Sequence, residues 1–143
     1  MSTVKFRGIT PYLHYEDAAA SLEWLARVFG FEEISRYVDG DGRVREAEML
    51  VGEQQLWLSG RDPGYWNEKG HGPEQLILIW VDDVDAHYAR VKAAGVDAEP
   101  PEDKPYGVRT YGVTDPDGYE WGFMQPTGTG YQQGEGGLTE VRA

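Results

Sequence analysis

The sequence predicts an α+β fold built from two β-α-β-β-β modules, and two observations carry that prediction. The first is the stretch 74–95, which combines a buried strand, an acidic helix cap and a glycine that ends the helix. The unbroken apolar run from Leu76 to Val81 is typical of a strand buried on both faces. Asp83 can accept hydrogen bonds from the first turn of the helix that follows, and Gly95 can end that helix in the left-handed conformation.

The second observation is that the stretch 10–30 repeats the same order. Asp17 corresponds to Asp83 at an offset of 66 residues (83 − 17), and Gly30 corresponds to Gly95 at an offset of 65 (95 − 30). One residue is therefore missing from the second helix. Modules of roughly 60 residues would be marginally stable alone, so we expect them to share a core or a sheet within one domain, residues 1–126.

The first module is predicted to span residues 4–59. Apolar residues at i, i+3 and i+7 give its helix a buried stripe, formed by Leu22, Leu25 and Phe29. An Asp-Gly-Asp-Gly sequence at 39–42 is typical of a hairpin turn. The predicted elements are a strand at 4–15, a helix at 17–29, and strands at 34–38, 43–50 and 55–59.

The second module is predicted to span residues 74–126. The linker 60–73 before it is polar and serves either as a plain connection or as a lid over a site. A glycine-rich tail at 127–143 has little to bury, so we expect it to be flexible or to pack on a partner. The predicted elements of the second module are a strand at 75–81, a helix at 84–94, and strands at 96–99, 108–114 and 119–124.

Composition limits the classes of partner and location. The chain has 143 residues, and 13 Lys and Arg against 25 Asp and Glu give a net charge of −12. Phosphate contacts need basic patches, so we expect no nucleic-acid partner. An acidic field would concentrate a cationic small molecule, although acidity can also serve solubility alone. Without a long apolar segment or an apolar signal region, we expect a cytoplasmic protein with no membrane partner. The lack of cysteine excludes disulfides and thiolate chemistry.

Several motifs together resemble the vicinal oxygen chelate superfamily of glyoxalase I, bleomycin-resistance proteins and extradiol dioxygenases. They are the V-D-D-V-D-A junction, the A-A-G that closes the helix and the D-P-D-G-Y turn before the last strand. The resemblance covers residues 5–126, and the segments 9–13 and 106–112 are most similar to its PhnB-like, glyoxalase-like branch. It implies the glyoxalase/bleomycin resistance/dihydroxybiphenyl dioxygenase fold, in which each module is a curled mixed sheet with its helix outside.

The resemblance also implies four metal-ligand positions, on the first and last strands of each module. Carried over position by position, they fall on Thr10, Trp57, Leu76 and Gly122. Leu, Trp and Gly offer no side-chain ligand atom, and a lone Thr hydroxyl is a poor one. We therefore expect no metal, no cofactor and no catalytic residue. The alternative is a metal-dependent lyase, isomerase or dioxygenase with other ligands, for example with Glu120 turned inward by a two-residue strand shift.

Strand alternation then predicts the side chains that line a cavity. The opposite faces, which include Leu56, Leu58, Ile77 and Ile79, are apolar and are expected to pack under the helices. Gly122 is expected to leave space where a metal ligand would otherwise project. The predicted ligand-binding residues are Tyr12, Trp57, Leu76, Leu78, Trp80, Glu120, Gly122 and Met124.

This lining suits a small aromatic or cationic compound, which the protein would sequester without chemistry as bleomycin-resistance relatives do. The resemblance also implies a homodimer with cavities built between subunits. A second alternative is an interaction module whose aromatic residues fill the cup or meet a partner.

The other polar residues that could take part in a site have several expected roles. Glu46, Glu48 and Glu120 could each act as an acid or base or pair with a ligand cation, or simply face water. A structural or surface role is expected for His14, and His87 is expected to be solvated.

Overall fold

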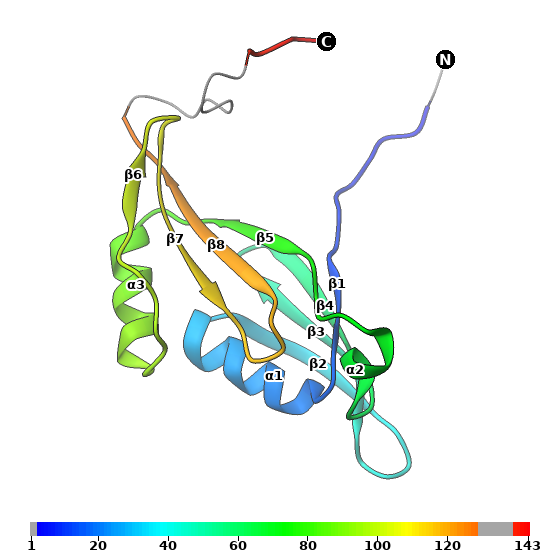
Figure 1. Ribbon diagram of the computed structural model, residues 1–143. Helices are drawn as coiled ribbons and strands as arrows, with labels where there is room; N and C mark the ends of the chain where they lie inside the picture. The colour runs from blue at the N-terminus through cyan, green and yellow to red at the C-terminus, as the bar shows by residue number, and fades with distance from the viewer. Residues whose placement is uncertain (1–2, 129–138) are drawn as a thin grey trace. The chain divides into compact units, whose positions relative to one another are not determined.

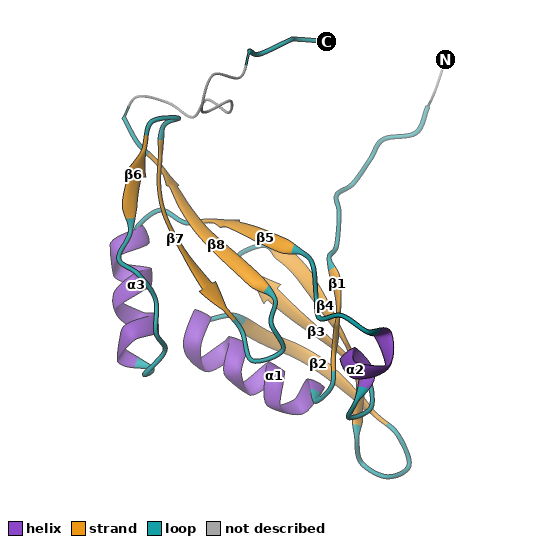
Figure 2. Cartoon of the chain, viewed as in Figure 1, coloured by secondary structure: helices purple, strands orange, loops and turns teal. Residues whose placement is uncertain are grey.

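The computed structural model describes residues 3–128 and 139–143, and it divides into two compact units, Met1–His71 and Gly72–Ala143. We call them unit 1 and unit 2 and treat each by itself. Each holds one four-stranded mixed sheet with an α-helix between its first and second strands along the chain (Figures 1 and 2). The predicted α+β class and the two modules are confirmed. The predicted tail lies largely outside the described residues.

Unit 1 has the strand order β1-β4-β3-β2. The β1–β4 pair is parallel, and the other two pairs are antiparallel. Helix α1 packs on β1, β3 and β4. The elements are β1 Tyr12–Tyr15, α1 Ala18–Trp24, a π-helical turn Leu25–Phe29, β2 Glu32–Val38, β3 Val44–Val51, β4 Gln54–Gly60 and α2 Tyr65–Lys69.

Unit 2 repeats this topology with the strand order β5-β8-β7-β6. The β5–β8 pair is again parallel, and helix α3 packs on β7 and β8. No helix in the described ranges is long and apolar enough to cross a membrane. The elements are β5 Leu76–Trp80, α3 Val84–Ala93, β6 Glu102–Lys104, β7 Val108–Thr114 and β8 Glu120–Pro126.

The helix ends repeat as the sequence predicts. Asp17 and Asp83 are both N-caps in the extended conformation, and each accepts a hydrogen bond from a backbone N–H three residues later, at 3.1 and 3.0 Å. After the helices, Gly30 and Gly95 have φ of 85° and 83°, which a residue with a side chain rarely adopts.

The one-residue difference between the helices has a structural counterpart. The first helix ends in the π-helical turn Leu25–Phe29, whereas α3 runs to Ala93 without one. A π-turn closes i to i+5 and therefore holds one more residue than an α-turn over the same height. The extra residue is taken up inside the helix, so that its cap and its terminal glycine keep equivalent places in both units.

Replacing the second cap should measurably weaken unit 2. Asp83→Ala removes the acceptor of the Ala86 N–H, and we expect the free energy of unfolding to fall by about 1 kcal/mol. The neighbouring Asp82→Ala variant removes the same charge from an exposed position that is not the cap, so it controls for charge. Urea unfolding of the two variants measures the difference, and equal midpoints would contradict the capping role.

Two strand predictions are wrong, and proline accounts for one of them. Residues 96–99 form no strand, and β6 instead starts at Glu102, inside the predicted loop. Pro100 and Pro101 have no N–H to donate, so ladder pairing begins only after them. The first strand begins at Tyr12 rather than at residue 4, and residues 3–10 are exposed. The predicted linker contains the short helix α2.

The predicted difference between the two faces of each sheet is largely confirmed. Leu56, Leu58, Trp121 and Phe123 are all at most 2 % exposed. The β5 residues of the same face, which include Ile77, are half-buried. The helix side of each sheet thus holds the apolar core, and the opposite face carries the candidate ligand residues.

Candidate ligand pocket

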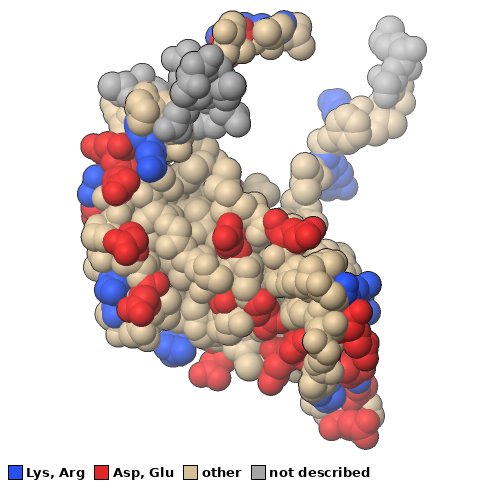
Figure 3. Space-filling model, viewed as in Figure 1, with Lys and Arg blue, Asp and Glu red and all other residues tan. Residues whose placement is uncertain are grey.

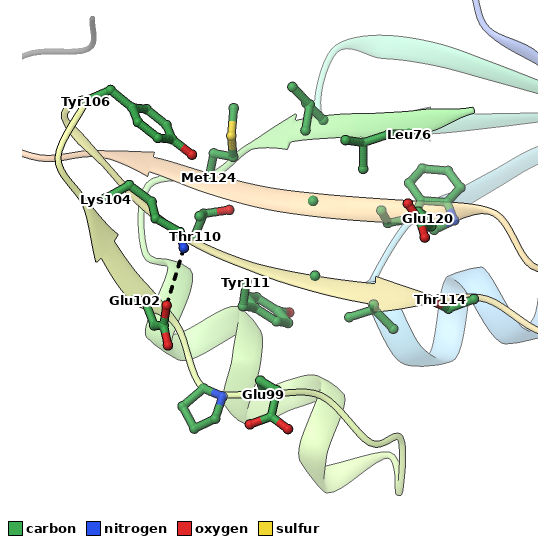
Figure 4. A pocket seen from close by; sticks show the side chains of 16 residues that line it. Leu76, Glu99, Glu102, Lys104, Tyr106, Thr110, Tyr111, Thr114, Glu120 and Met124 are labelled. Carbon is green, nitrogen blue, oxygen red and sulfur yellow. Dashed lines mark hydrogen bonds and ion pairs between the residues drawn. The ribbon is translucent and has the colours of Figure 1, made fainter. Parts of the chain in front are cut away.

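A pocket of about 930 Å³ lies on the face of the unit 2 sheet away from the core (Figure 4). Strands β5, β6, β7 and β8 and the segment before β6 all contribute to its lining. This is within the usual size range for sites that bury a small organic molecule. Its apolar lining includes Leu76, Leu78, Tyr106 and Met124.

Two glycines form the middle of the pocket floor. Gly112 of β7 and Gly122 of β8 are direct partners in the antiparallel ladder, and Leu78 of β5 is the partner of Gly122 on its other side. Successive residues of a strand point to opposite faces, so this row faces the pocket. Two positions without side chains therefore lie next to each other in the floor.

Only one of the two glycines leaves open space. A Cβ atom at Gly122 would lie 2.9 Å from Cδ2 of Leu78, so this leucine leans over the position that the sequence marks as open. A Cβ atom at Gly112 would meet the Trp121 carbonyl oxygen at 3.6 Å, an ordinary contact. The expectation of space at Gly122 is therefore corrected: the room lies over Gly112, and Leu78 forms one wall beside it.

Polar groups lie toward the two ends of the pocket. Tyr106, Lys104 and Thr110 gather toward one end in Figure 4, and Glu120 and Thr114 lie toward the other. Nζ of Lys104 is 3.3 Å from a carboxylate oxygen of Glu102, so this positive charge is already paired. The Glu120 side chain makes no hydrogen bond or ion pair with any residue that the structure describes. The pocket is thus apolar in the middle, and the exposed carboxylates of Glu120 and Glu99 are part of its lining.

Asp115 fixes the turn from which β8 enters the pocket floor. One carboxylate oxygen accepts hydrogen bonds from the backbone N–H groups of Asp117, Gly118 and Tyr119 at 3.0–3.1 Å. The other accepts from Nε1 of Trp121 at 3.1 Å. Asp115 is only 4 % exposed, so these bonds form away from water. They set the register at which Glu120 and Gly122 reach the pocket.

Aromatic packing under α3 supports the floor from behind. Nδ1 of His87 lies 2.5 Å from the Tyr111 hydroxyl, and its ring centroid is 4.1 Å from that of Phe123. Burial raises the pKa of Tyr111 above its usual value. The prediction that His87 is solvated is therefore wrong, because its ring packs between helix and sheet.

The structure places the eight predicted ligand residues in three locations. Leu76, Leu78, Glu120, Gly122 and Met124 line the pocket. Trp80 ends β5 on the same face, 49 % exposed and outside the pocket lining. Tyr12 and Trp57 are neighbours in unit 1.

The sequence reasoning missed the contribution of β7. Thr110, Gly112 and Thr114 all line the pocket. The strand 108–114 was predicted with its observed bounds, and alternation along it would have placed these three residues on one face.

The unit 1 face is more polar. The Tyr12 hydroxyl donates to the Glu46 carboxylate at 2.6 and 2.8 Å, and Nδ1 of His14 lies 2.6 Å from the Ser59 hydroxyl. Burial lowers the pKa of His14, and the charges of Arg61 and Lys69 lower it further. His14 therefore belongs to the hydrogen-bonded framework of the sheet.

The residues at the superfamily's metal positions do not fit a divalent ion. Leu76 presents methyl groups, the indole N–H of Trp57 donates to Gln55, and Gly122 has no side chain. Thr10 is exposed and lies outside β1. Within residues 3–128 and 139–143, no group of three or more His, Asp or Glu side chains is arranged to hold a metal.

Comparisons with known proteins agree with this architecture. TioX from Micromonospora sp. ML1 has a similar structure, with a TM-score of 0.67 and 32 % identity over 85 % of this chain and 97 % of TioX. TnmS3, an antibiotic binding protein from Streptomyces sp. CB03234, is similar in fold, with a TM-score of 0.69 and 22 % identity over 89 % of this chain and all of TnmS3 (100 %).

The sequence is also 29 % identical over 126 residues to the uncharacterized protein Rv0887c of Mycobacterium tuberculosis, covering 83 % of this chain and 74 % of that protein. A family model described as the Glyoxalase/Bleomycin resistance protein/Dioxygenase superfamily matches residues 11–123. The chain therefore belongs to the glyoxalase/bleomycin resistance protein/dioxygenase superfamily.

Proposed function

We propose that the protein binds a small, flat, mainly apolar organic molecule in the unit 2 pocket and performs no chemistry on it. The observation that carries the proposal is the glycine floor. The exposed backbone at Gly112 offers a flat surface, and the Leu76, Leu78 and Met124 side chains beside it offer apolar contacts. An aromatic ring laid on that floor would exclude water from both surfaces.

Orientation would come from the polar ends of the pocket. Glu120 can accept from an N–H or an ammonium group on the ligand, and the Tyr106 and Thr110 hydroxyls lie toward the other end. A few polar groups around an apolar middle are typical of sites that select one small molecule. The antibiotic binding stated for TnmS3 supports the proposal as an analogy of fold.

We further propose that binding needs no metal and that the protein works as a cytoplasmic homodimer that sequesters its ligand. The donor set at the superfamily's metal positions supports the first part, because three of the four positions have no side-chain ligand atom. The competing function is a metal-dependent lyase, isomerase or dioxygenase that uses other ligands.

A neutral fluorescent probe tests the proposal. N-phenyl-1-naphthylamine, which brightens in apolar surroundings, should bind the purified protein and raise its apparent stability, by about 2.7 kcal/mol at a hundred times its Kd. Treatment with EDTA should leave both signals unchanged. Binding that disappears with EDTA and returns with a divalent ion would contradict metal-free binding and favour the enzyme.

A further inference from the structure

A second cluster of ligand-type side chains lies on the unit 1 sheet. Tyr12 and Trp57 are partners across the β1–β4 pair, 44 % and 42 % exposed, with ring centroids 6.5 Å apart and planes at 89°. Their polar atoms are already used, because the Tyr12 hydroxyl donates to Glu46 and Nε1 of Trp57 donates to Gln55 at 2.7 Å. The two rings therefore offer a ligand their π faces rather than hydrogen bonds.

Two carboxylates flank these rings, and neither forms an ion pair within the part of the chain that the structure describes. Glu46 and Glu48 alternate along β3 on the same face, and Glu48 is the ladder partner of Trp57. Their hydrogen-bond partners among the described residues are tyrosine hydroxyls, of Tyr12 for Glu46 and of Tyr37 for Glu48 at 3.0 Å. Neither forms an ion pair with a Lys or Arg in that part of the chain.

Two other acidic residues of this hairpin, Glu33 and Asp39, contrast with these two. Glu33 pairs with Arg36 at 2.8 Å, and Asp39 pairs with Arg45 at 2.8 Å. Arg61 and Lys69 lie over the Tyr65 ring at 5.4 and 5.5 Å, and the charge of Arg61 also acts on Tyr12. Acidic groups also cover more of the surface drawn in Figure 3 than basic ones, in line with the net charge of −12.

We propose that this face binds an organic ammonium ion against Tyr12 and Trp57, with Glu46 and Glu48 as its counter-charges. A cation within about 6 Å of a ring centroid is attracted to the ring face, and Trp is the strongest partner. Two perpendicular rings can each present a face to one cation. The nearby carboxylates add attraction and select against anions. Burial raises the pKa of Tyr12 and its hydrogen bond to Glu46 raises it further, while the charge of Arg61 lowers it.

The unit 1 face and the unit 2 pocket differ in chemistry. The pocket combines an apolar middle with carboxylates in its lining, whereas the unit 1 face places two carboxylates beside two exposed rings. Choline and its neutral isostere 3,3-dimethyl-1-butanol have nearly the same shape and differ in charge, so comparing them measures the contribution of the positive charge. The unit 1 variants then show whether this face binds it. Isothermal titration calorimetry should show binding of choline and much weaker binding of the neutral alcohol.

Matched variants locate that binding. Glu48→Gln and Trp57→Leu should each weaken choline binding by roughly 3- to 30-fold, the range that cation–π and ion-pair losses of about 0.7–2 kcal/mol imply. Tyr12→Phe keeps the ring face and should change the affinity little. Glu33→Gln removes an equal charge from a residue already paired with Arg36, so it should leave choline binding intact.

Two results would overturn the proposal. The first is a failure of choline to bind. Equal weakening of choline binding by Glu33→Gln and Glu48→Gln counts in the same way, because the acidity of the whole protein would then explain the attraction. The other combines two observations: sedimentation shows that Trp57→Leu turns a dimer into a monomer, and the parent protein does not bind choline. A second copy of the chain would then cover this face. If Trp57→Leu fails to fold, comparing the choline affinities of Glu48→Gln and Glu33→Gln still tests the proposal.

Discussion

Asp115→Ala is expected to lower the free energy of unfolding by about 3 kcal/mol, the largest stability effect that we predict. The carboxylate accepts three backbone N–H groups and the Trp121 indole N–H, and it is almost fully buried. Truncation would leave those donors unpaired in a region that water reaches poorly. Leaving a buried donor unpaired costs more free energy than an intact hydrogen bond contributes. The loss of stability should therefore exceed that of an ordinary surface mutation.

Urea unfolding followed by circular dichroism measures this loss. Asp97→Ala is the control, because Asp97 is fully exposed and contacts Lys92 only at 3.9 Å, so its removal should matter by less than about 0.5 kcal/mol. Asp115→Asn should fall between the two, since it keeps one acceptor oxygen for the turn. Similar midpoints for Asp115→Ala and Asp97→Ala would show that the turn does not depend on this carboxylate.

Gly112→Val is expected to abolish binding of N-phenyl-1-naphthylamine, raising its Kd by roughly 100-fold or more, while the fold persists. The position has an ordinary strand conformation, and a Cβ atom there would approach the rest of the protein no closer than 3.6 Å. The added isopropyl group would therefore rise from the floor into the pocket. A loss of at least about 2.7 kcal/mol corresponds to that change in affinity.

Gly112→Val should not lose stability, although it should lose probe binding. Glycine inside a strand is unfavourable relative to a β-branched residue, so Gly112→Val should leave the thermal midpoint unchanged or slightly higher. Gly128→Val is the matched control, because a Cβ atom there has no neighbour within 4 Å and the residue is outside the pocket lining. Unaltered probe binding by a folded Gly112→Val protein would place the ligand elsewhere.

The repeat was the most predictable part of the fold, because its signals are local. A carboxylate before a helix and a glycine after it act through neighbouring backbone groups, so Asp17 and Asp83, and Gly30 and Gly95, could be assigned without tertiary information. Strand faces were predictable for a related reason. One face must be apolar to pack under a helix, and this requirement fixes which residues point the other way.

The details of the pocket could not be predicted from the sequence. Alternation along the strand 108–114 places Gly112 on one face with Thr110 and Thr114, but it does not show that this face lines a pocket. The position of the Leu78 side chain over Gly122 depends on a rotamer, which no pattern along the chain reveals. His87 is predicted to be solvated because it lies on an acidic helix, yet its ring packs against Phe123 between that helix and the sheet. The assignment to the PhnB-like branch stays a prediction.

A crystal structure of the protein grown with N-phenyl-1-naphthylamine tests the central claim most directly. We predict the naphthyl ring lying flat over Gly112, beside Leu78 and Met124, with no metal ion in contact. A divalent cation held in this pocket by protein side chains, or a probe bound away from the glycine floor, would contradict the account.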